Sequence, residues 1–368
     1  MSIYSLTLSD WEQLLKTLDT PGYRAKQILE WLYRSRVTGF DAMSNLPAAL
    51  RERLAKEVPP LKMEMTRGLG ARDTTRKFLF KLHDGRYIET VLIPASPALY
   101  GSSSDRRTLC VSSQVGCAFD CKFCASGLAG FTRNLEASEI VGQFTEVERH
   151  SGEKVSNLVF MGMGEPLANL PNLLKAIEII NAPWGIGLGA RHLTISTSGL
   201  APQIRKLSDY PLQVRLAVSL HGASNSVRDQ IMPVNKRFPL EELFDALKEY
   251  NSKKKQKITF EYILIEGVND HLEQARLLAA RARPLHAKVN LIPYNTVEGL
   301  QWKRPHISQQ ERFLGVLQQA GIQATLRREK GHDIDAACGQ LRLQTEKAEE
   351  GFQGSKVSGF QGYESSLS

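Results

Sequence analysis

The sequence has few cysteines and no long hydrophobic run. No apolar stretch in its 368 residues approaches the roughly 20 that a membrane-spanning helix needs. The opening residues, MSIYSLTLSDWEQLL, do not place a basic segment before an apolar one, so they do not resemble a signal peptide. These absences argue against a membrane partner and lead us to expect a cytoplasmic protein.

Three of the five cysteines, Cys117, Cys121 and Cys124, lie within the eight residues CAFDCKFC. Structural disulfides are rare in the cytoplasm, so clustered cysteines there indicate metal or redox chemistry. A structural zinc site usually takes four ligands from two separated pairs, and no second cysteine pair follows in the sequence. Three thiolates can instead hold three irons of a cubane cluster and leave the fourth iron open to a substrate. A zinc site completed by a distant Cys or His is the alternative.

Composition and charge set broad limits on the fold and the partner. Hydrophobic residues make up 42% of the chain, which is ample for one large domain and a smaller one. The formal net charge of +8 is compatible with a polyanionic partner such as RNA, and equally with a merely basic protein.

From residue 108 onward, short apolar runs alternate with helical patterns. The apolar runs are TLCVSS, NLVFMG, RHLTISTS, QVRLAVSL, KITFEYIL, AKVNLIP and QATLRR. The helices expected between them cover residues 137–150, 171–181, 200–208, 239–252, 270–283 and 308–320. This alternation predicts an α/β fold with a parallel sheet and crossover helices. Six or seven such units favour a full or partial barrel, although a doubly wound open sheet fits the pattern too.

The earlier part of the chain reads differently. Residues 1–60 are expected to form a small helical module, with Ser9 and Glu12 as a capping box. Residues 74–93 are expected to form a β-hairpin around HDG.

Past residue 108, unusual polar motifs follow the predicted strands: GMGEP, STSG, SLHG and PYN. Because ligands bind at the carboxyl ends of parallel strands, we expect these motifs to share one cavity.

The C-x3-C-x2-C spacing directly after the first of these strands resembles the signature of the radical S-adenosylmethionine (SAM) superfamily. The resemblance implies a [4Fe-4S] cluster on the three clustered cysteines, with SAM on its fourth iron. The motifs at the strand ends would then contact SAM. Among them, Gly164 and Glu165 would bind its ammonium group. The SAM residues implied in this way are Gly164, Glu165, Ser196, Ser219, Leu220, His221 and Asn295.

A closer resemblance is carried by TLCVSSQVGCAFDCKFCASGLAGFTRNL, FMGMGEPLAN, IMPVNKRFPL, FEYILIEGVND and DIDAACGQL. Together these motifs look like the RlmN/Cfr family of RNA methyltransferases, over roughly residues 10–342, and they are closer to RlmN. The family's fold is a partial (β/α) barrel, which agrees with the count of units above. By this resemblance Cys338 carries the methyl group, Cys110 resolves the intermediate through a transient Cys110–Cys338 disulfide, and Glu89 accepts a proton.

The resemblance also implies the reaction and its partners. An RlmN-type enzyme would methylate carbon 2 of adenosine in 23S rRNA and in tRNA next to the anticodon, using electrons from a donor such as flavodoxin or ferredoxin. A Cfr-type enzyme would methylate carbon 8. A radical SAM enzyme with a non-RNA substrate, and a non-catalytic RNA-binding or metal-sensing protein, are further alternatives.

We expect the chain to have four parts. Residues 1–60 form a helical accessory domain that binds RNA, 61–102 a linker with the hairpin, 103–342 the radical SAM core and 343–368 a disordered tail. Three basic stretches, Arg72 to Lys77, Lys303–Arg304 and Arg327 to Lys330, would suit phosphate contacts or lie on a solvated surface. We expect a monomer.

Overall fold

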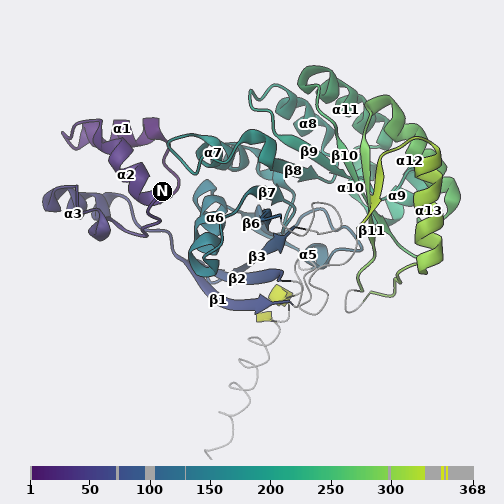
Figure 1. The fold of residues 1–368 in the computed structure, drawn as a ribbon, viewed down its shortest axis with the longest axis horizontal. Helices are drawn as coiled ribbons and strands as arrows, with labels where there is room; N and C mark the ends of the chain where they lie inside the picture. Colours follow the sequence, from purple (N-terminus) through teal and green to yellow (C-terminus); the bar gives the residue numbers. More distant parts are fainter. Residues whose placement is uncertain are drawn as a thin grey trace, which may run out of the picture.

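The computed structural model describes residues 2–71, 74–95, 104–128, 130–296, 300–327, 341–343 and 345–346. Figure 1 shows three regions along the longest axis: helices α1 to α3 at one end, antiparallel strands in the middle, and a parallel β/α region at the other end. One hydrophobic cluster runs through all of them, from Trp11 and Leu15 to Phe160 and Leu216. None of the described helices is long and apolar enough to cross a membrane.

The N-terminal region is helical, as predicted. It contains α1 (Leu8–Thr17), α2 (Arg24–Tyr33), the 3₁₀ turn η1 (Phe40–Ala42) and α3 (Ala48–Glu57). A capping box starts α1, but the prediction of Ser9 and Glu12 is wrong. The extended backbone of Thr7 ends the preceding segment, so its hydroxyl accepts the Asp10 N–H while the Asp10 carboxylate accepts the Thr7 N–H.

Three antiparallel strands come next: β1 (Met63–Gly70), β2 (Arg76–Leu82) and β3 (Tyr87–Pro94). The hairpin predicted over residues 74–93 is confirmed as β2 and β3. Strand β1 lies outside the predicted hairpin. Its apolar residues Met63, Met65 and Leu69 are only half-buried, and Arg67 and Gly68 interrupt the alternation.

Seven strands then form the parallel part of the same sheet. They are β4 (Arg107–Cys110), β7 (Asn157–Phe160), β8 (Leu193–Thr197), β9 (Arg215–Ser219), β10 (Thr259–Leu264), β11 (Lys288–Pro293) and β12 (Ala324–Leu326). The order across the ten-stranded sheet is β1-β2-β3-β4-β7-β8-β9-β10-β11-β12. Each new strand of this sheet is therefore added beside the previous one, in a single direction. In a doubly wound sheet the strand order would reverse once. The predicted partial barrel is confirmed, and the doubly wound alternative is wrong.

The six helices predicted between these strands lie within two residues of their expected ends. They are α6 (Ala137–Ser151), α7 (Leu170–Asn181), α8 (Ala201–Ser208), α11 (Leu240–Lys254), α12 (Leu272–Ala282) and α13 (Ile307–Gln319). In Figure 1, α8, α11, α12 and α13 lie outside the strands that they connect.

Several short elements were not predicted. They are the small sheet of β5 (Gln114–Gly116) and β6 (Phe131–Asn134), the helices α5 (Ala125–Leu128), α9 (Asn225–Ile231) and α10 (Val234–Arg237), and the 3₁₀ turns η2 (Pro166–Asn169), η3 (Ala190–His192) and η4 (Arg283–Leu285). With three to seven residues each, they are too short for a periodic pattern to identify.

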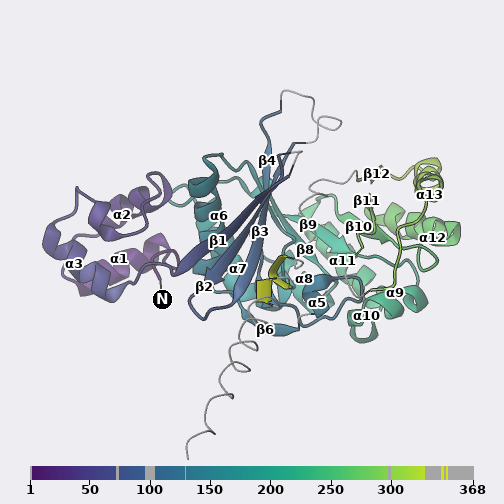
Figure 2. The same ribbon diagram turned by 90° about the horizontal axis from the view of Figure 1, so that it is seen from below.

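Residues 341–343 and 345–346 form a helical turn beside β2 and β3 (Figure 2). Helical structure therefore continues past residue 342, where the prediction placed the start of a disordered tail. The rest of that tail, residues 347–368, lies outside the described residues.

Candidate active site

The cysteine loop lies between β5 and α5, after the first parallel strand, as predicted. Its backbone is anchored at both sides: the Cys117 N–H donates to the Gly130 carbonyl at 2.9 Å, and the Lys122 N–H donates to the Ile231 carbonyl at 2.9 Å. The thiols lie close enough to raise one another's pKa. Burial, aided by this repulsion, raises the pKa of Cys117 to about 12 and the pKa of Cys121 well above its usual value.

These thiols fit an iron–sulfur cluster better than a single metal ion. In the part of the chain that is described, no group of three or more His, Cys, Asp or Glu side chains is gathered tightly enough to hold one ion. A cubane cluster needs only one thiolate on each of three irons, so its ligands do not converge on a single point. The donor set therefore supports a cluster with one open iron over a closed zinc site.

The loop after β7 brings Glu165 among the strand ends. Gly164 has φ +96°, and a Cβ there would lie 2.5 Å from the Gln114 side chain, so only glycine fits. The Glu165 carboxylate is 3% exposed and accepts the Ser198 N–H at 2.6 Å and the Leu167 N–H at 3.0 Å. Burial raises the pKa of Glu165, and these hydrogen bonds oppose that shift.

The ends of β8 and β9 supply the next residues. Ser196 is nearly buried near the end of β8, Ser219 is half-buried at the end of β9, and Leu220 is fully buried. His221 follows with φ +55°, and its Nδ1 accepts the Ile263 N–H at 3.0 Å. Burial and the nearby Arg228 cation lower the pKa of His221 to about 3, so the ring is neutral.

His221 also connects the strand ends to the cysteine loop. Its ring meets the ring of Phe123 edge-to-face, with the centroids 4.7 Å apart. Asn295, after β11, is exposed, and its Oδ1 accepts a hydrogen bond from Arg304 at 2.7 Å. Since β11 is parallel to β10, Asn295 lies at the same edge of the sheet as His221.

Sequence reasoning missed Arg228, a fully buried cation in α9. It donates to the Leu220 carbonyl at 3.0 Å, to Asn235 Oδ1 at 2.9 Å and to the Ser198 carbonyl. Burial lowers the pKa of Arg228 to about 10, and the nearby Cys121 raises it. Arg228 thus ties the ends of β8 and β9 together and places a positive charge beside the cysteine loop. Its position in a polar helix, SVRDQI, gave no sign of burial.

A second group of predicted residues lies on the antiparallel strands. Glu89 in β3 is 2% exposed and forms an ion pair with the fully buried Lys77 of β2, with Nζ and Oε2 3.0 Å apart. Cys110 in β4 is buried and pairs in register with Val91. Val91 is two residues from Glu89, so Glu89 and Cys110 project from the same face of the sheet. The suggestion that Lys77 contacts phosphate from the surface is wrong, because its side chain in β2 is fully buried.

The helical turn near the C-terminus covers this face. The Arg342 N–H donates to Glu89 Oε1 at 2.6 Å, and Leu341 packs against Leu79 and Tyr87. Cys338 lies outside the described residues, three positions before Leu341. The structure therefore brings together Glu89, Cys110 and the segment that follows Cys338.

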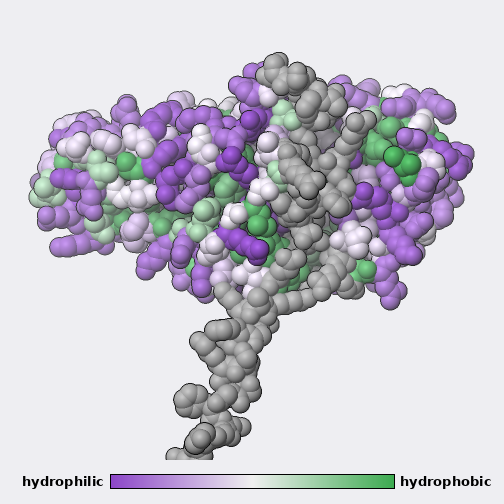
Figure 3. Space-filling model, turned by 60° about the horizontal axis from the view of Figure 1, so that its bottom comes forward, coloured by the Kyte–Doolittle hydropathy of each residue, from purple (hydrophilic) through white to green (hydrophobic). Residues whose placement is uncertain are grey.

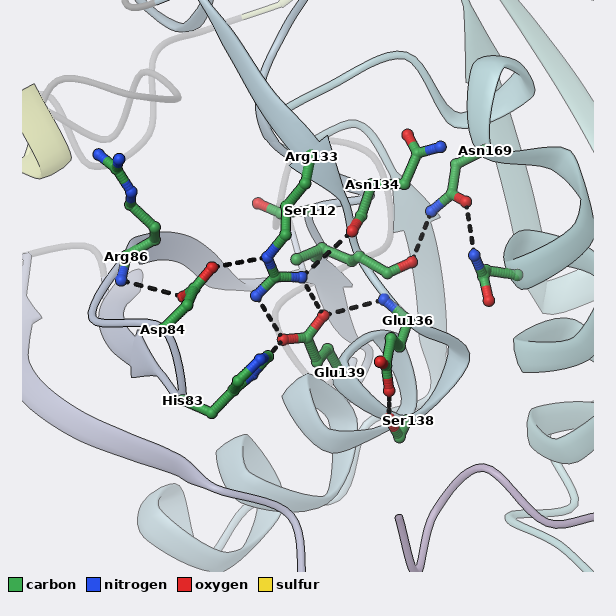
Figure 4. A network of polar contacts seen from close by, with 12 residues as sticks. His83, Asp84, Arg86, Ser112, Arg133, Asn134, Glu136, Ser138, Glu139 and Asn169 are labelled. Carbon is green, nitrogen blue, oxygen red and sulfur yellow. Dashed lines mark hydrogen bonds and ion pairs between the residues drawn. The ribbon is translucent and has the colours of Figure 1, made fainter. Parts of the chain in front are cut away.

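Arg133 connects three elements near the site, and Figure 4 shows its contacts with Glu139 and Asp84. From β6 it donates to both oxygens of Glu139 in α6, at 2.7 and 2.8 Å, and to Asp84 in the β2–β3 turn at 2.6 Å. The two carboxylates raise the pKa of Arg133, and Arg133 lowers the pKa of Asp84 despite partial burial. The strand that follows the cysteine loop is thereby fixed to the hairpin that carries Glu89.

Comparison with known proteins agrees with this geometry. Residues 111–279 match the model of the radical SAM superfamily, and residues 1–58 match that of the ribosomal RNA large subunit methyltransferase N-terminal domain. The chain is 54% identical to the probable dual-specificity RNA methyltransferase RlmN of Akkermansia muciniphila, covering 94% of this chain and 97% of that protein. It is 52% identical to RlmN 3 of Opitutus terrae, covering 93% and 94%.

A solved structure is similar as well. The crystal structure of a radical SAM methyltransferase from Sphaerobacter thermophilus superimposes with a TM-score of 0.87 at 43% identity, covering 92% of this chain and 98% of that one. Fold and cysteine loop together define a radical SAM enzyme, a class that implies a [4Fe-4S] cluster and SAM. The chain belongs to the RlmN family of radical SAM RNA methyltransferases. The family, fold and enzyme class expected from the sequence are confirmed.

Proposed function

We propose that this protein methylates carbon 2 of adenosine in 23S rRNA and in tRNA, as the dual-specificity names of its relatives suggest. The observation that carries the mechanism is the buried face where Glu89, Cys110 and the segment following Cys338 meet. Three residues of chain span at most about 10 Å, so Cys338 can reach that face from Leu341.

The chemistry explains why two cysteines are needed. Carbon 2 of adenine is electron-poor and cannot simply attack a methyl sulfonium, whereas a cysteine thiolate can. Cys338 therefore accepts a methyl group first. Cys117, Cys121 and Cys124 would hold the cluster, and the SAM bound to it would supply the radical that takes one hydrogen atom from this methyl group. The activated carbon then bonds to the adenine ring and tethers it to Cys338.

The remaining steps belong to Glu89 and Cys110. The Glu89 carboxylate accepts the proton from carbon 2 as the ring adduct gives up one electron, which would return to the electron donor. Lys77 and the Arg342 N–H hold that carboxylate in place. Cys110 attacks the Cys338 sulfur, so that an S–S bond forms as the S–C bond to the base breaks, and the released carbon takes a proton to become a methyl group. A cytoplasmic reductant restores the thiols.

We also propose the SAM site itself. Gly164, Glu165, Ser196, Asn295 and the segment 219–221 lie at the carboxyl ends of neighbouring strands, as the sequence motifs predicted. The Ser198 N–H donates to Glu165 and the Ile263 N–H donates to His221, so the ends of β7 and β8 and the ends of β9 and β10 are joined in pairs. These contacts support the proposed site. It adjoins the cysteine loop through Phe123.

The RNA, the electron donor and the monomeric state are part of this proposal too. The net charge of +8 favours a polyanionic substrate. On the face drawn in Figure 3, hydrophilic residues predominate and hydrophobic residues form separate patches, which suits an RNA more than a large apolar partner. A reactive adenine must leave its stack to meet Cys338, so single-stranded loops are the expected targets.

The test is to reconstitute the cluster without oxygen, add SAM, a reductant and unmodified 23S rRNA or tRNA, and identify the nucleosides by mass spectrometry. We expect 2-methyladenosine from both RNAs, and none from Cys338→Ala. Appearance of 8-methyladenosine would instead indicate a Cfr-type enzyme. If 5′-deoxyadenosine accumulates without any methylated adenosine, the radical chemistry stands and the RNA substrate is wrong.

A further inference from the structure

A cavity lies at the junction between the accessory helices and the core. Its volume is about 220 Å³, and its walls come from the C-terminal end of α2, from α6, and from the segments around Lys154 and Gly187. Neither the cluster site nor the Glu89 face contributes a lining residue. The volume greatly exceeds the roughly 30 Å³ that one water molecule occupies.

Two residues that line this cavity carry buried hydrogen-bond donors with no partner among the described residues. The Tyr33 hydroxyl is one, on a side chain that is 1% exposed, and Arg36 Nη1 is the other. Burial raises the pKa of Tyr33, so the phenol keeps its proton and can donate. Burying such donors without a partner is unfavourable, so a ligand that accepts hydrogen bonds is favoured here.

The backbone and its neighbours hold Arg36 in place. Arg36 has φ +58°, a conformation that non-glycine residues rarely adopt. Its Nε and Nη2 both donate to Glu148 Oε2, at 3.1 and 2.5 Å, and its guanidinium lies 5.7 Å from the Phe144 ring centroid. Nη1 is the part of the guanidinium that this arrangement leaves for a ligand.

The charge in the cavity is positive. Arg34, Arg36 and Lys154 contribute three cations, and Glu148 is the one carboxylate among the lining residues. Arg34 donates to the Ile186 carbonyl at 2.9 Å and to the Pro183 carbonyl at 2.9 Å, so it connects the accessory helices to the core while adding its charge. Two donors with surplus positive charge match an oxyanion.

We infer that this cavity binds a phosphate group, whose oxygens accept hydrogen bonds from the Tyr33 hydroxyl and Arg36 Nη1. The phosphate is either a phosphodiester of the RNA, a source that depends on the function proposed above, or free inorganic phosphate. An RNA phosphate bound here would contact the accessory helices and the core together.

The test uses the full-length protein and Tyr33→Phe, which removes one hydroxyl and no packing atoms. Thermal unfolding is followed in inorganic phosphate and in chloride at equal ionic strength, and affinity is measured for unmodified tRNA. We expect phosphate to raise the midpoint of the parent protein and not that of Tyr33→Phe. We expect tRNA to bind the variant roughly tenfold more weakly, since one hydrogen bond to a charged group is lost.

Two further variants isolate the effect. Lys175→Gln removes a cation at the same junction but outside the cavity, where Lys175 pairs with Asp10 at 3.0 Å, and it should leave the phosphate effect intact. Arg36→Gln combined with Glu148→Gln removes the charged pair together, so no buried carboxylate is left unpaired. This double variant should lose the phosphate effect as Tyr33→Phe does.

The outcomes separate the two sources. Loss of tRNA affinity in Tyr33→Phe identifies an RNA phosphate, and loss of phosphate stabilisation with unchanged tRNA affinity identifies free phosphate. If phosphate does not stabilise the parent protein and tRNA affinity does not change, the inference is overturned. Methylation is measured separately, so phosphate binding without 2-methyladenosine would refute the proposed function and leave this site standing.

Discussion

Lys77 and Glu89 form an ion pair in which both side chains are almost completely buried. A buried pair of this kind contributes little net stability, but removing one partner is costly because the other charge is left in a medium of low polarity. In this protein the pair also holds the proposed proton acceptor on the face that carries Cys110. The cation therefore matters to the chemistry through the position of Glu89.

Lys77→Met is expected to lower the free energy of unfolding by about 3–5 kcal/mol and to abolish formation of 2-methyladenosine. Lys77→Met combined with Glu89→Gln leaves no charge unpaired, so it should recover most of the stability and none of the activity. Denaturant unfolding and nucleoside analysis measure the two effects. Equal stability of the single and double variants would contradict this interpretation of the pair.

His221 gives a prediction that depends on pH. Its pKa is about 3 when folded and 6.5 when exposed, so between these values only the unfolded chain binds the proton. The unfolded state is thereby favoured as the pH falls, and this site lowers stability by about 1.4 kcal/mol for each pH unit below 6.5.

His221→Asn should remove that contribution. Asn tolerates the positive φ and can accept the Ile263 N–H, but it does not titrate. Unfolding free energies of the two proteins, measured from pH 7 to pH 5 in the same cluster state, should therefore converge as the pH falls. Parallel curves would show that His221 has the same pKa in the folded and the unfolded state.

At the scale of residues, the sequence identifies candidate site residues but does not predict their burial. The family resemblance points to Glu89 and Cys110, while the local pattern predicts a surface position for Lys77. The burial of Lys77 and Arg228 depends on strands and loops that are distant in sequence, so local patterns cannot reveal it.

One side chain, that of Arg133, links β6 to two neighbouring elements. Arg133 connects β6 with the first turn of α6 and with the β2–β3 turn, and Glu139, its bidentate partner, is nearly buried. The position of the cysteine loop relative to the hairpin thus depends on a charged contact between three elements.

Arg133→Ala should lower the free energy of unfolding by about 2–3 kcal/mol, because Glu139 is left buried without its charged donor. SAM cleavage and methylation should both fall, since the loop is no longer fixed. Asp84→Ala is the matched control: Asp84 is 27% exposed, so its loss should cost less than about 1 kcal/mol. Equal effects of the two variants would argue against a special role for the Glu139 contact.

Periodicity identified the long elements and failed on the short ones. The 15 residues of α6 and of α11 show a clear apolar face, and their predicted limits were nearly right. The three residues of β5 are held by pairing with β6, a tertiary contact that no short sequence window encodes.

Across the whole molecule, strand order decided what the sequence pattern left open. Barrel and doubly wound sheets share the same alternation of strands and helices, and they differ only in whether the order reverses. In this chain the single direction of winding brings the cysteine loop, the motifs proposed to bind SAM and the Glu89 face to one region, and leaves α1 to α3 at the far end (Figure 1).

That arrangement predicts how the molecule responds when the cluster is removed. Burial raises the pKa of Cys117 and Cys121, so both are protonated once iron is chelated. The loop then loses its attachment to the metal while the sheet keeps its core. Hydrogen exchange should accelerate in residues 117–128 and in α9, which bonds the loop through Ile231, and should stay unchanged in α1 and α2. If exchange accelerates equally in α1 and α2, the cluster stabilises the entire fold rather than the site, and the accessory helices do not fold independently of it.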